Sequence, residues 1–202
     1  MNVAVLASGA GTNLQALLDG VHLRDGVEIV AVASDQPEAF ALERARAVGV
    51  PVGVFPRTEY ETRLERDLAI AAWLSEREVE LVVLAGYMQL LSGAFLERFP
   101  NRVINVHPAL LPAFPGLHAV EQGMAYGARV FGVTVHFVDE GVDSGPIILQ
   151  RAVEAPDAPD AGAVLALLHP VEHELLPEAV RLIAAGSVRV DDANPRRVVI
   201  DR

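Results

Sequence analysis

An asparagine and a histidine stand two positions apart in Asn105-Val106-His107-Pro108, where a short apolar run ends. The run predicts a β-strand over residues 102–106, and residues two apart along a strand point to the same face. An amide donor beside an imidazole can stabilise a developing oxyanion and move a proton. The alternative is a strand end whose asparagine and histidine only satisfy neighbouring loops.

A short acidic segment with two glycines, Asp139 to Pro146, is the next candidate. Gly141 and Gly145 would let it fold over a cleft, and Asp143 is then a candidate partner for His107 that favours the charged imidazole. The alternative is a hairpin tip without a further role. His136, within a predicted strand, is expected to be a buried, hydrogen-bonded histidine, with support of the site as the alternative.

The segment Ser8-Gly9-Ala10-Gly11-Thr12-Asn13 lies between the first predicted strand and the first predicted helix. Free backbone N–H groups and the positive end of a helix dipole bind anions at such junctions. Asp35, after the second strand, could take a ribose hydroxyl in a dinucleotide site, but Leu14 replaces the third glycine of that fingerprint. We therefore expect a single phosphate here, with a nicotinamide cofactor or an empty junction as alternatives.

The segment His169-Pro170-Val171-Glu172-His173 matches H-x-x-E-H, the inverted zinc-protease motif. A zinc site of that kind needs a third ligand well downstream, and Pro170 disturbs the helix that would present the histidines. We therefore expect no metal here. The segment is expected to form a helix surface and part of the rim of a substrate cleft.

Composition excludes several kinds of chemistry. All 16 basic residues are arginine, which excludes a catalytic Schiff-base lysine and a P-loop lysine. There is no cysteine, so thiolate nucleophiles, disulfides and cysteine-ligated metals are excluded as well. A net charge of −11 argues against nucleic-acid binding. The first apolar run is too short for a signal peptide or a membrane span, so we expect a cytoplasmic protein with no membrane partner.

Apolar runs and helical stretches alternate through the first hundred residues. Strands are predicted over residues 2–7, 28–33, 52–55, 81–85 and 102–106, and helices over 12–23, 38–48, 59–78 and 92–99. Strands separated by helices pair in parallel through right-handed crossovers. The predicted fold class is therefore α/β, with a doubly wound, mostly parallel sheet.

The pattern changes after His107. Pro108, Pro112 and Pro115 predict an extended, ordered loop. The remaining expected elements are a helix at 119–127, hairpin strands at 130–138 and 146–153, a helix at 161–185 that is broken or kinked near its two prolines, and ribbon strands at 187–190 and 198–200. We expect a single domain, 1–202, with a phosphate-binding half (1–100) and a catalytic half (101–202).

Six stretches, taken together and in order, resemble the folate-dependent phosphoribosylglycinamide formyltransferases of purine biosynthesis. They read VAVLASGAGTNLQAL, ALERARAVGVP, VVLAGYMQLL, VINVHPALLPAFPGLHA, GVTVHFVDEGVDSGPIILQ and VEHELLPEAV, and they extend over nearly the whole chain. The resemblance implies a Rossmann-like formyltransferase fold with helices on both faces of the sheet, a C-terminal hairpin and a long helix. It also implies transfer of a formyl group from 10-formyltetrahydrofolate to the amine of glycinamide ribonucleotide, without a metal.

The resemblance also implies residue roles. The catalytic group is Asn105, His107 and Asp143. The glycinamide ribonucleotide is contacted by a phosphate loop and by a later helical segment, which comprise Gly11, Thr12, Asn13, His169, Pro170, Val171 and Glu172. The folate pocket is formed by an apolar segment, by the catalytic asparagine and by the acidic loop, which comprise Met88, Gln89, Leu90, Leu91, Asn105, Asp139, Glu140, Gly141, Val142 and Asp143.

Three positions depart from the family pattern, and the smallest change is Thr12, which replaces a frequent serine. Gln89 stands where arginine is common, which affects a charged contact to the glutamate tail of folate, and Ala109 replaces a usual serine. Among related enzymes, a methionyl-tRNA formyltransferase would carry an added basic domain, a formyltetrahydrofolate hydrolase a preceding regulatory domain, and a nucleotide-sugar formyltransferase no SGAGTN loop. A non-enzymatic nucleotide-binding module would leave the catalytic group without a purpose. Monomer and homodimer both remain open.

Overall fold

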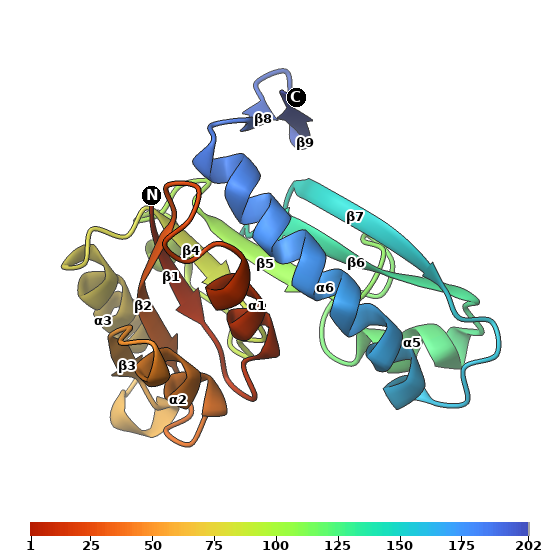
Figure 1. Cartoon of the computed structure of the whole chain (residues 1–202), viewed down its shortest axis with the longest axis horizontal. Helices are drawn as coiled ribbons and strands as arrows, with labels where there is room; N and C mark the ends of the chain where they lie inside the picture. Colours follow the sequence, from red (N-terminus) through yellow and green to blue (C-terminus); the bar gives the residue numbers. More distant parts are fainter. Residues whose placement is uncertain (202) are drawn as a thin grey trace. The chain divides into compact units, whose positions relative to one another are not determined.

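The computed structural model describes residues 1–201 and contains a seven-stranded sheet and a separate two-stranded ribbon (Figure 1). The strand order in the large sheet is β3-β2-β1-β4-β5-β6-β7, and the ribbon pairs β8 with β9. The chain divides into two compact units, Met1–Asn105 and Val106–Arg202. The division falls within strand β5, between the asparagine and the histidine of the first motif.

The strands of the first unit are buried and pair in parallel. They are β1 (Asn2–Leu6), β2 (Glu28–Ser34), β3 (Val52–Val54), β4 (Leu81–Leu84) and β5 (Val103–His107). Their apolar residues are continuous rather than alternating because helices cover both faces of a parallel sheet. Polar side chains at the carboxyl ends of these strands therefore gather along one edge of the sheet.

The helices of the first unit follow from the same connectivity. They are α1 (Thr12–Gly20), α2 (Phe40–Ala47), η1 (Arg57–Glu59), α3 (Arg63–Ser75) and α4 (Gly93–Leu96). Right-handed crossovers place α1 beside α2 on one face of the sheet and α3 beside α4 on the other. The third helix begins later than expected, because the side chain of Thr62 accepts a hydrogen bond from the Glu65 amide and caps it there.

The second unit is built on an antiparallel hairpin and a long helix. Its elements are α5 (Ala119–Tyr126), β6 (Val130–Phe137), β7 (Ile147–Glu154), α6 (Ala161–Ala184), β8 (Val188–Asp191) and β9 (Asn194–Ile200). Helix α6 packs against both hairpin strands and against α5. The predicted mostly parallel α/β fold with a hairpin and a long C-terminal helix is thus confirmed.

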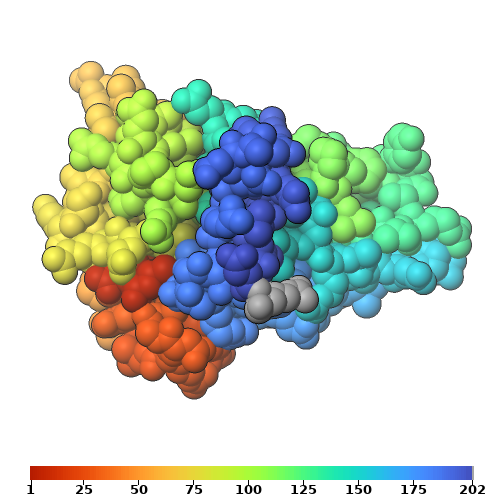
Figure 2. Space-filling model, turned by 90° about the horizontal axis from the view of Figure 1, so that it is seen from above, coloured from red at the N-terminus to blue at the C-terminus, as the bar shows by residue number. Residues whose placement is uncertain are grey.

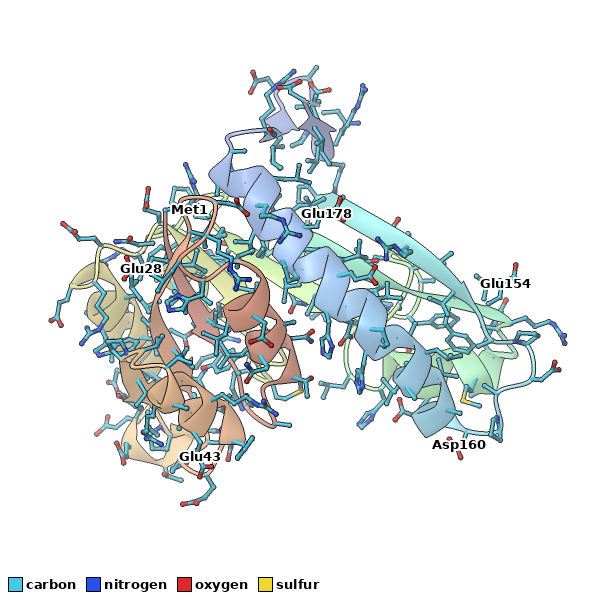
Figure 3. All side chains as sticks on the ribbon, in the orientation of Figure 1. Met1, Glu28, Glu43, Glu154, Asp160 and Glu178 are labelled. Atoms are coloured by element: carbon cyan, nitrogen blue, oxygen red, sulfur yellow. The ribbon has the colours of Figure 1, made fainter. Side chains whose placement is uncertain are left out.

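Helix α6 is continuous, so the break expected near its prolines does not occur. Asp160 caps its start by accepting a hydrogen bond from the Ala163 amide at 2.8 Å (Figure 3). Pro170 and Pro177 each remove one backbone donor, yet both lie inside the helix. A buried apolar face, which includes Leu168 and Leu176, compensates for the missing bonds. Within residues 1–201 no helix, α6 included, is long and apolar enough to cross a membrane.

The terminal ribbon lies on the surface of the second unit, where it is drawn in dark blue (Figure 2). Strand β9 packs beside β7, and its Arg196 donates a hydrogen bond to the backbone carbonyl of Ser144. The same guanidinium lies 3.9 Å from the carboxylate of Asp139. One ribbon side chain therefore contacts both ends of the acidic loop between β6 and β7.

Candidate active site

His107 and Asp143 lie together in the second unit. His107 ends strand β5 and is only 5% exposed, whereas Asp143 lies in the loop that joins β6 to β7. The imidazole Nδ1 is 3.3 Å from Oδ2 of Asp143. The hairpin therefore brings together two side chains that are 36 positions apart in the sequence. Their pairing was predicted from the glycines that let the acidic loop fold back.

The Asp143 carboxylate is held by two further groups. The backbone N–H of Gly116 donates to Oδ2 at 2.8 Å, and Nε2 of His136 lies 3.5 Å from Oδ1. Burial raises the pKa of the Asp143 carboxyl, but the hydrogen bonds from His136 and Gly116 and the nearby His107 outweigh burial, so the pKa lies below its usual value. Asp143 is therefore ionised near neutral pH and serves as a fixed negative charge beside His107.

The second ring nitrogen of His107 also faces an acceptor. Nε2 lies 2.9 Å from the backbone carbonyl oxygen of Phe114. Because Nδ1 faces Asp143, a doubly protonated ring can donate to both partners at once. Phe114 adopts a left-handed conformation, φ 53°, which is uncommon for a bulky residue. A strained backbone position thus directs this carbonyl at the histidine.

The loop that carries Phe114 and Gly116 is fixed to the hairpin by polar side chains of both hairpin strands. The Thr134 hydroxyl donates to the Ala109 carbonyl at 2.6 Å and accepts from the Leu111 amide at 3.2 Å. The side-chain amide of Gln150 donates to the Leu111 carbonyl at 2.8 Å. These contacts hold the first part of the loop close to the site, as expected for an ordered proline-rich segment.

His136 is buried next to the catalytic candidates. Its Nδ1 lies 2.7 Å from the Phe137 carbonyl, and its Nε2 faces Asp143. The sequence left two interpretations open, a satisfied core histidine or a support of the site. The structure combines them, because His136 is buried and one of its nitrogens lies against the carboxylate. A strand position alone could not reveal that contact.

Asn105 belongs to the first unit and lies on β5 two positions before His107. It pairs in register with Leu84 of β4 and is partly exposed. Residues two apart in a strand share a face, so the backbone aims the Asn105 amide and the His107 imidazole to the same side of β5.

The glycine-containing loop connects β1 to α1 and is supported by α2. Gly11 begins α1 at φ 70°, and a Cβ there would lie 2.7 Å from Cα of Ala41. Ala41 donates its N–H to the Gly9 carbonyl, and Nε of Arg44 donates to the Ala10 carbonyl at 2.8 Å. The loop is thus fixed from behind, while Thr12 at the start of α1 is exposed. A fixed backbone at the N-terminus of a helix suits an anionic ligand.

Asp35, the ribose partner in the dinucleotide alternative, is engaged inside the first unit. It is 3% exposed and accepts hydrogen bonds from Ser8 at 2.5 Å, Gln36 at 2.9 Å and Gln89 at 3.0 Å. A carboxylate with three donors and little exposure is poorly placed to bind a ribose hydroxyl. The nicotinamide alternative therefore loses the residue on which it depended.

The segment Met88–Leu91 follows β4 in the first unit. The side chains of Met88 and Leu90 are more than half exposed, whereas Gln89 is half-buried. Gln89 accepts a hydrogen bond at 3.1 Å from Arg66, a buried arginine of α3 that the sequence analysis did not single out. The Gln89 side chain is thus hydrogen-bonded to a buried group inside the unit.

His169, Glu172 and His173 stand at positions i, i+3 and i+4 of α6 and are therefore neighbours along the helix. Glu172 is buried, His169 is exposed, and the rings of His169 and His173 stack with centroids 6.3 Å apart. Burial, with a smaller effect of His169, lowers the pKa of His173 although Glu172 opposes this. Among residues 1–201, no three histidine or acidic side chains are grouped in a way that could hold a metal ion.

The predicted site residues are thus divided between the two units. The first unit contains the phosphate loop (Gly11, Thr12 and Asn13), the segment Met88–Leu91 and Asn105. The second unit contains His107, the loop from Asp139 to Asp143, and the α6 segment from His169 to Glu172. Within the second unit, His107 contacts Asp143, and the Gly141 N–H donates to Oδ1 of Asp139 at 3.1 Å.

Comparison with known proteins places the chain in a family. The formyl transferase family matches residues 1–180. The phosphoribosylglycinamide formyltransferase of Bacillus subtilis (strain 168) is 38% identical over 191 residues, which cover 94% of this chain and 98% of that protein. The crystal structure of glycinamide ribonucleotide transformylase 1 from Symbiobacterium toebii has a TM-score of 0.95 and 45% identity, and the match covers 100% of this chain and 94% of that one.

Longer relatives contain a similar region. The trifunctional purine biosynthetic protein adenosine-3 of Drosophila pseudoobscura pseudoobscura is 42% identical over 190 residues, or 93% of this chain, but the match covers only 14% of that protein. This chain therefore spans about one seventh of the length of that relative. Because the match to the formyl transferase family covers most of the chain, and because single-function relatives match over nearly their full length, the chain belongs to the phosphoribosylglycinamide formyltransferases.

Proposed function

We propose that this protein transfers the formyl group of 10-formyltetrahydrofolate to the amine of N1-(5-phosphoribosyl)glycinamide, a step of de novo purine biosynthesis. The observation that carries the proposal is the match over nearly the full length of the Bacillus subtilis enzyme. The contact between His107 and Asp143 supports the chemistry, because it holds an imidazole, a group that can donate a proton, at a strand end. The protein acts on two small molecules, and we place the reaction in the cytoplasm.

The reaction begins with the neutral amine of the glycinamide, whose pKa of about 8 leaves an adequate fraction unprotonated at neutral pH. The amine nitrogen attacks the formyl carbon, and negative charge develops on the formyl oxygen. We assign Asn105 and protonated His107 as hydrogen-bond donors to this oxygen. The bond from the formyl carbon to N10 of the folate then breaks, N10 gains a proton and the amine loses one. No metal is needed for any of these steps.

Asp143 has two tasks in this proposal. Its carboxylate lies 3.3 Å from Nδ1 and fixes the orientation of the imidazole ring. We also assign it as the acceptor of the amine proton, directly or through water. Its lowered pKa keeps the carboxylate ionised through the neutral range, which the first task requires.

The Phe114 carbonyl has a direct consequence for substrate binding. It occupies the hydrogen-bond position at Nε2 of His107, which the proposal gives to the formyl oxygen. Both are oxygen acceptors, so the substrate oxygen would replace the carbonyl without leaving a nitrogen unpaired. The loop around Phe114 must therefore release this contact before the reaction.

The remaining residues are assigned to the two substrates. Gly11, Thr12 and Asn13 hold the substrate phosphate through backbone amides, and the segment from His169 to Glu172 contacts the rest of the ribonucleotide. Met88, Gln89, Leu90 and Leu91, together with Asn105 and the loop from Asp139 through Glu140, Gly141 and Val142 to Asp143, line the folate pocket. The two exposed side chains of the first segment, Met88 and Leu90, offer the apolar surface that a flat ring system needs.

The proposal is tested by ligand binding and product identification. We expect glycinamide ribonucleotide and folic acid each to raise the melting temperature, and NAD to leave it unchanged. Mass spectrometry of a reaction with both substrates should detect formylated glycinamide ribonucleotide. Stabilisation by NAD alone, or the absence of the formylated product, would contradict the proposed function.

A further inference from the structure

Arg66 is a charged side chain that is buried inside the first unit. It lies on α3, is 2% exposed, and directs Nε and Nη2 to Oδ1 of Asp67 at 3.3 and 3.0 Å. A guanidinium removed from water is strongly unfavourable unless its charge and its donors are satisfied. Asp67 balances the charge but leaves Nη1 in need of another acceptor.

Gln89 supplies that acceptor and extends the contact across the unit. Its Oε1 accepts from Nη1 of Arg66 at 3.1 Å, and its Nε2 donates to Asp35 at 3.0 Å. Both ends of the amide are therefore used, with its oxygen toward the cation and its nitrogen toward the anion. A glutamine fits this position because it offers an acceptor and a donor at one end of a side chain.

The same network holds the backbone on both sides of Gln89. The Met88 N–H donates to the Ser8 hydroxyl at 2.9 Å, and that hydroxyl donates to Asp35. At the other end, the Ser92 N–H donates to Oδ2 of Asp67 at 2.7 Å. The segment between these anchors is thus fixed by buried groups, while Met88 and Leu90 remain exposed.

We infer that Arg66 is a positioning residue that acts through Gln89 to set the conformation of Met88–Leu91 for binding of the formyl donor. This inference rests on the proposed function, which gives the segment to the folate pocket. It also accounts for the departure at position 89. The cation in the interior of the unit is Arg66 of α3. The side chain of Gln89 is directed inward, where it bridges Arg66 and Asp35. Gln89 therefore contributes no charge to binding the anionic folate tail.

The competing explanation is that Arg66 and Asp67 form an ion pair that stabilises α3 and nothing more. The two explanations differ at Gln89. A purely structural pair requires only that the protein remain folded, whereas a positioning role requires that the loss of the bridge weaken donor binding even in a folded protein. Substitutions at the two ends of the Arg66–Gln89 contact therefore separate them.

The test compares Arg66→Gln, Gln89→Met and the double variant with Arg46→Gln, a substitution of an exposed arginine on α2 that loses the same charge. We expect the KM for 10-formyltetrahydrofolate to rise about tenfold in each of the first two, which is the size of one hydrogen bond to a charged group. The KM for the glycinamide substrate and kcat should change little. The donor KM of the double variant should be no higher than that of either single variant, because each single substitution already breaks the same Arg66–Gln89 contact. Arg46→Gln should match the wild type.

Two further measurements keep the test independent of folding and of the proposed reaction. Gln89→Met leaves the Arg66–Asp67 pair in place, so it carries the test if Arg66→Gln does not fold by circular dichroism. Titration calorimetry with folic acid compares donor-site binding even if the wild type does not formylate the glycinamide. Unchanged donor KM and folic acid affinity in folded Gln89→Met, additive effects in the double variant, or equal effects of Arg46→Gln and Arg66→Gln would each overturn the inference.

Discussion

At the scale of single residues, His107 is the side chain on which the proposed chemistry depends most. It is buried, paired with an ionised carboxylate through one nitrogen, and bound to a replaceable acceptor through the other. We expect His107→Ala to lower kcat by roughly 10²–10⁴-fold, as loss of a general acid or an oxyanion donor does. The KM values for both substrates should change little. Steady-state kinetics of the purified, folded variant measure this, and a kcat near that of the wild type would remove His107 from the mechanism.

Asp143 should affect stability as well as rate, with a pH dependence of known sign. Its pKa is lowered in the folded protein, so the ionised carboxylate adds stability at pH values above the usual carboxyl pKa of about 4. That stability is lost as the pH falls through the lower, folded-state pKa. Asp143→Asn should therefore unfold at lower urea concentration than the wild type at pH 7, and the difference should shrink by pH 3. A difference that grew on acidification would contradict the assignment.

The residue scale is also where sequence and structure differ most. The contact between His107 and Asp143 could be predicted, because the residue types and the glycines of the acidic loop indicate it. The Gly116 amide, the Phe114 carbonyl and the His136 contact could not, since a backbone group has no signature in the sequence and a strand position does not identify a neighbour in a loop. Arg66 is a similar case, because an arginine on a helix is usually solvated.

At the scale of elements, the loop between β6 and β7 depends on Gly145. A Cβ at this position would lie 1.8 Å from the Phe137 carbonyl oxygen, a distance that backbone atoms cannot tolerate. Gly145→Ala should therefore destabilise the protein by about 2–4 kcal/mol, within the range of severe steric substitutions. Gly9→Ala is a matched control, because a Cβ there meets no other atom within 4 Å. Equal urea midpoints for the two variants would show that the loop can rearrange.

The terminal ribbon should restrict this loop through Arg196. Its contacts with Asp139 and Ser144 are exposed, so the loss of global stability in Arg196→Ala should be under about 1 kcal/mol. Hydrogen exchange in the loop should nevertheless become faster, because local opening needs less free energy than global unfolding. Arg197→Ala is the matched control, since Arg197 pairs with Asp191 within the ribbon at 3.7 Å. Equal exchange rates in both variants would show that Arg196 does not hold the loop.

Most elements could be predicted because their apolar periodicity is strong, and the errors are local. The third helix starts at Arg63 rather than near residue 59, since a threonine cap outweighs the helical pattern before it. Helix α6 was expected to break near Pro170 and Pro177, yet it runs through both prolines. In each case a contact specific to the folded protein decided the outcome, either a cap or a buried face, and periodicity does not report either of them.

At the scale of the whole molecule, the alternation of strands and helices predicted the doubly wound sheet, and the order of six motifs predicted the family. Each motif lies at a strand end, in a loop or on one face of α6, where the fold presents side chains and amides to ligands. The division of the chain into two units could be predicted only as a change of pattern near residue 100, because contacts rather than composition define it.

The central claim is that the formyl group passes directly to the glycinamide amine with the help of His107. The most direct measurement follows the release of tetrahydrofolate spectrophotometrically for the wild type and for His107→Ala, with and without glycinamide ribonucleotide. The account predicts fast release only from the wild type and only when the ribonucleotide is present. Release at the same rate without the ribonucleotide would indicate hydrolysis instead of transfer and would contradict the account, as would equal release by the two proteins.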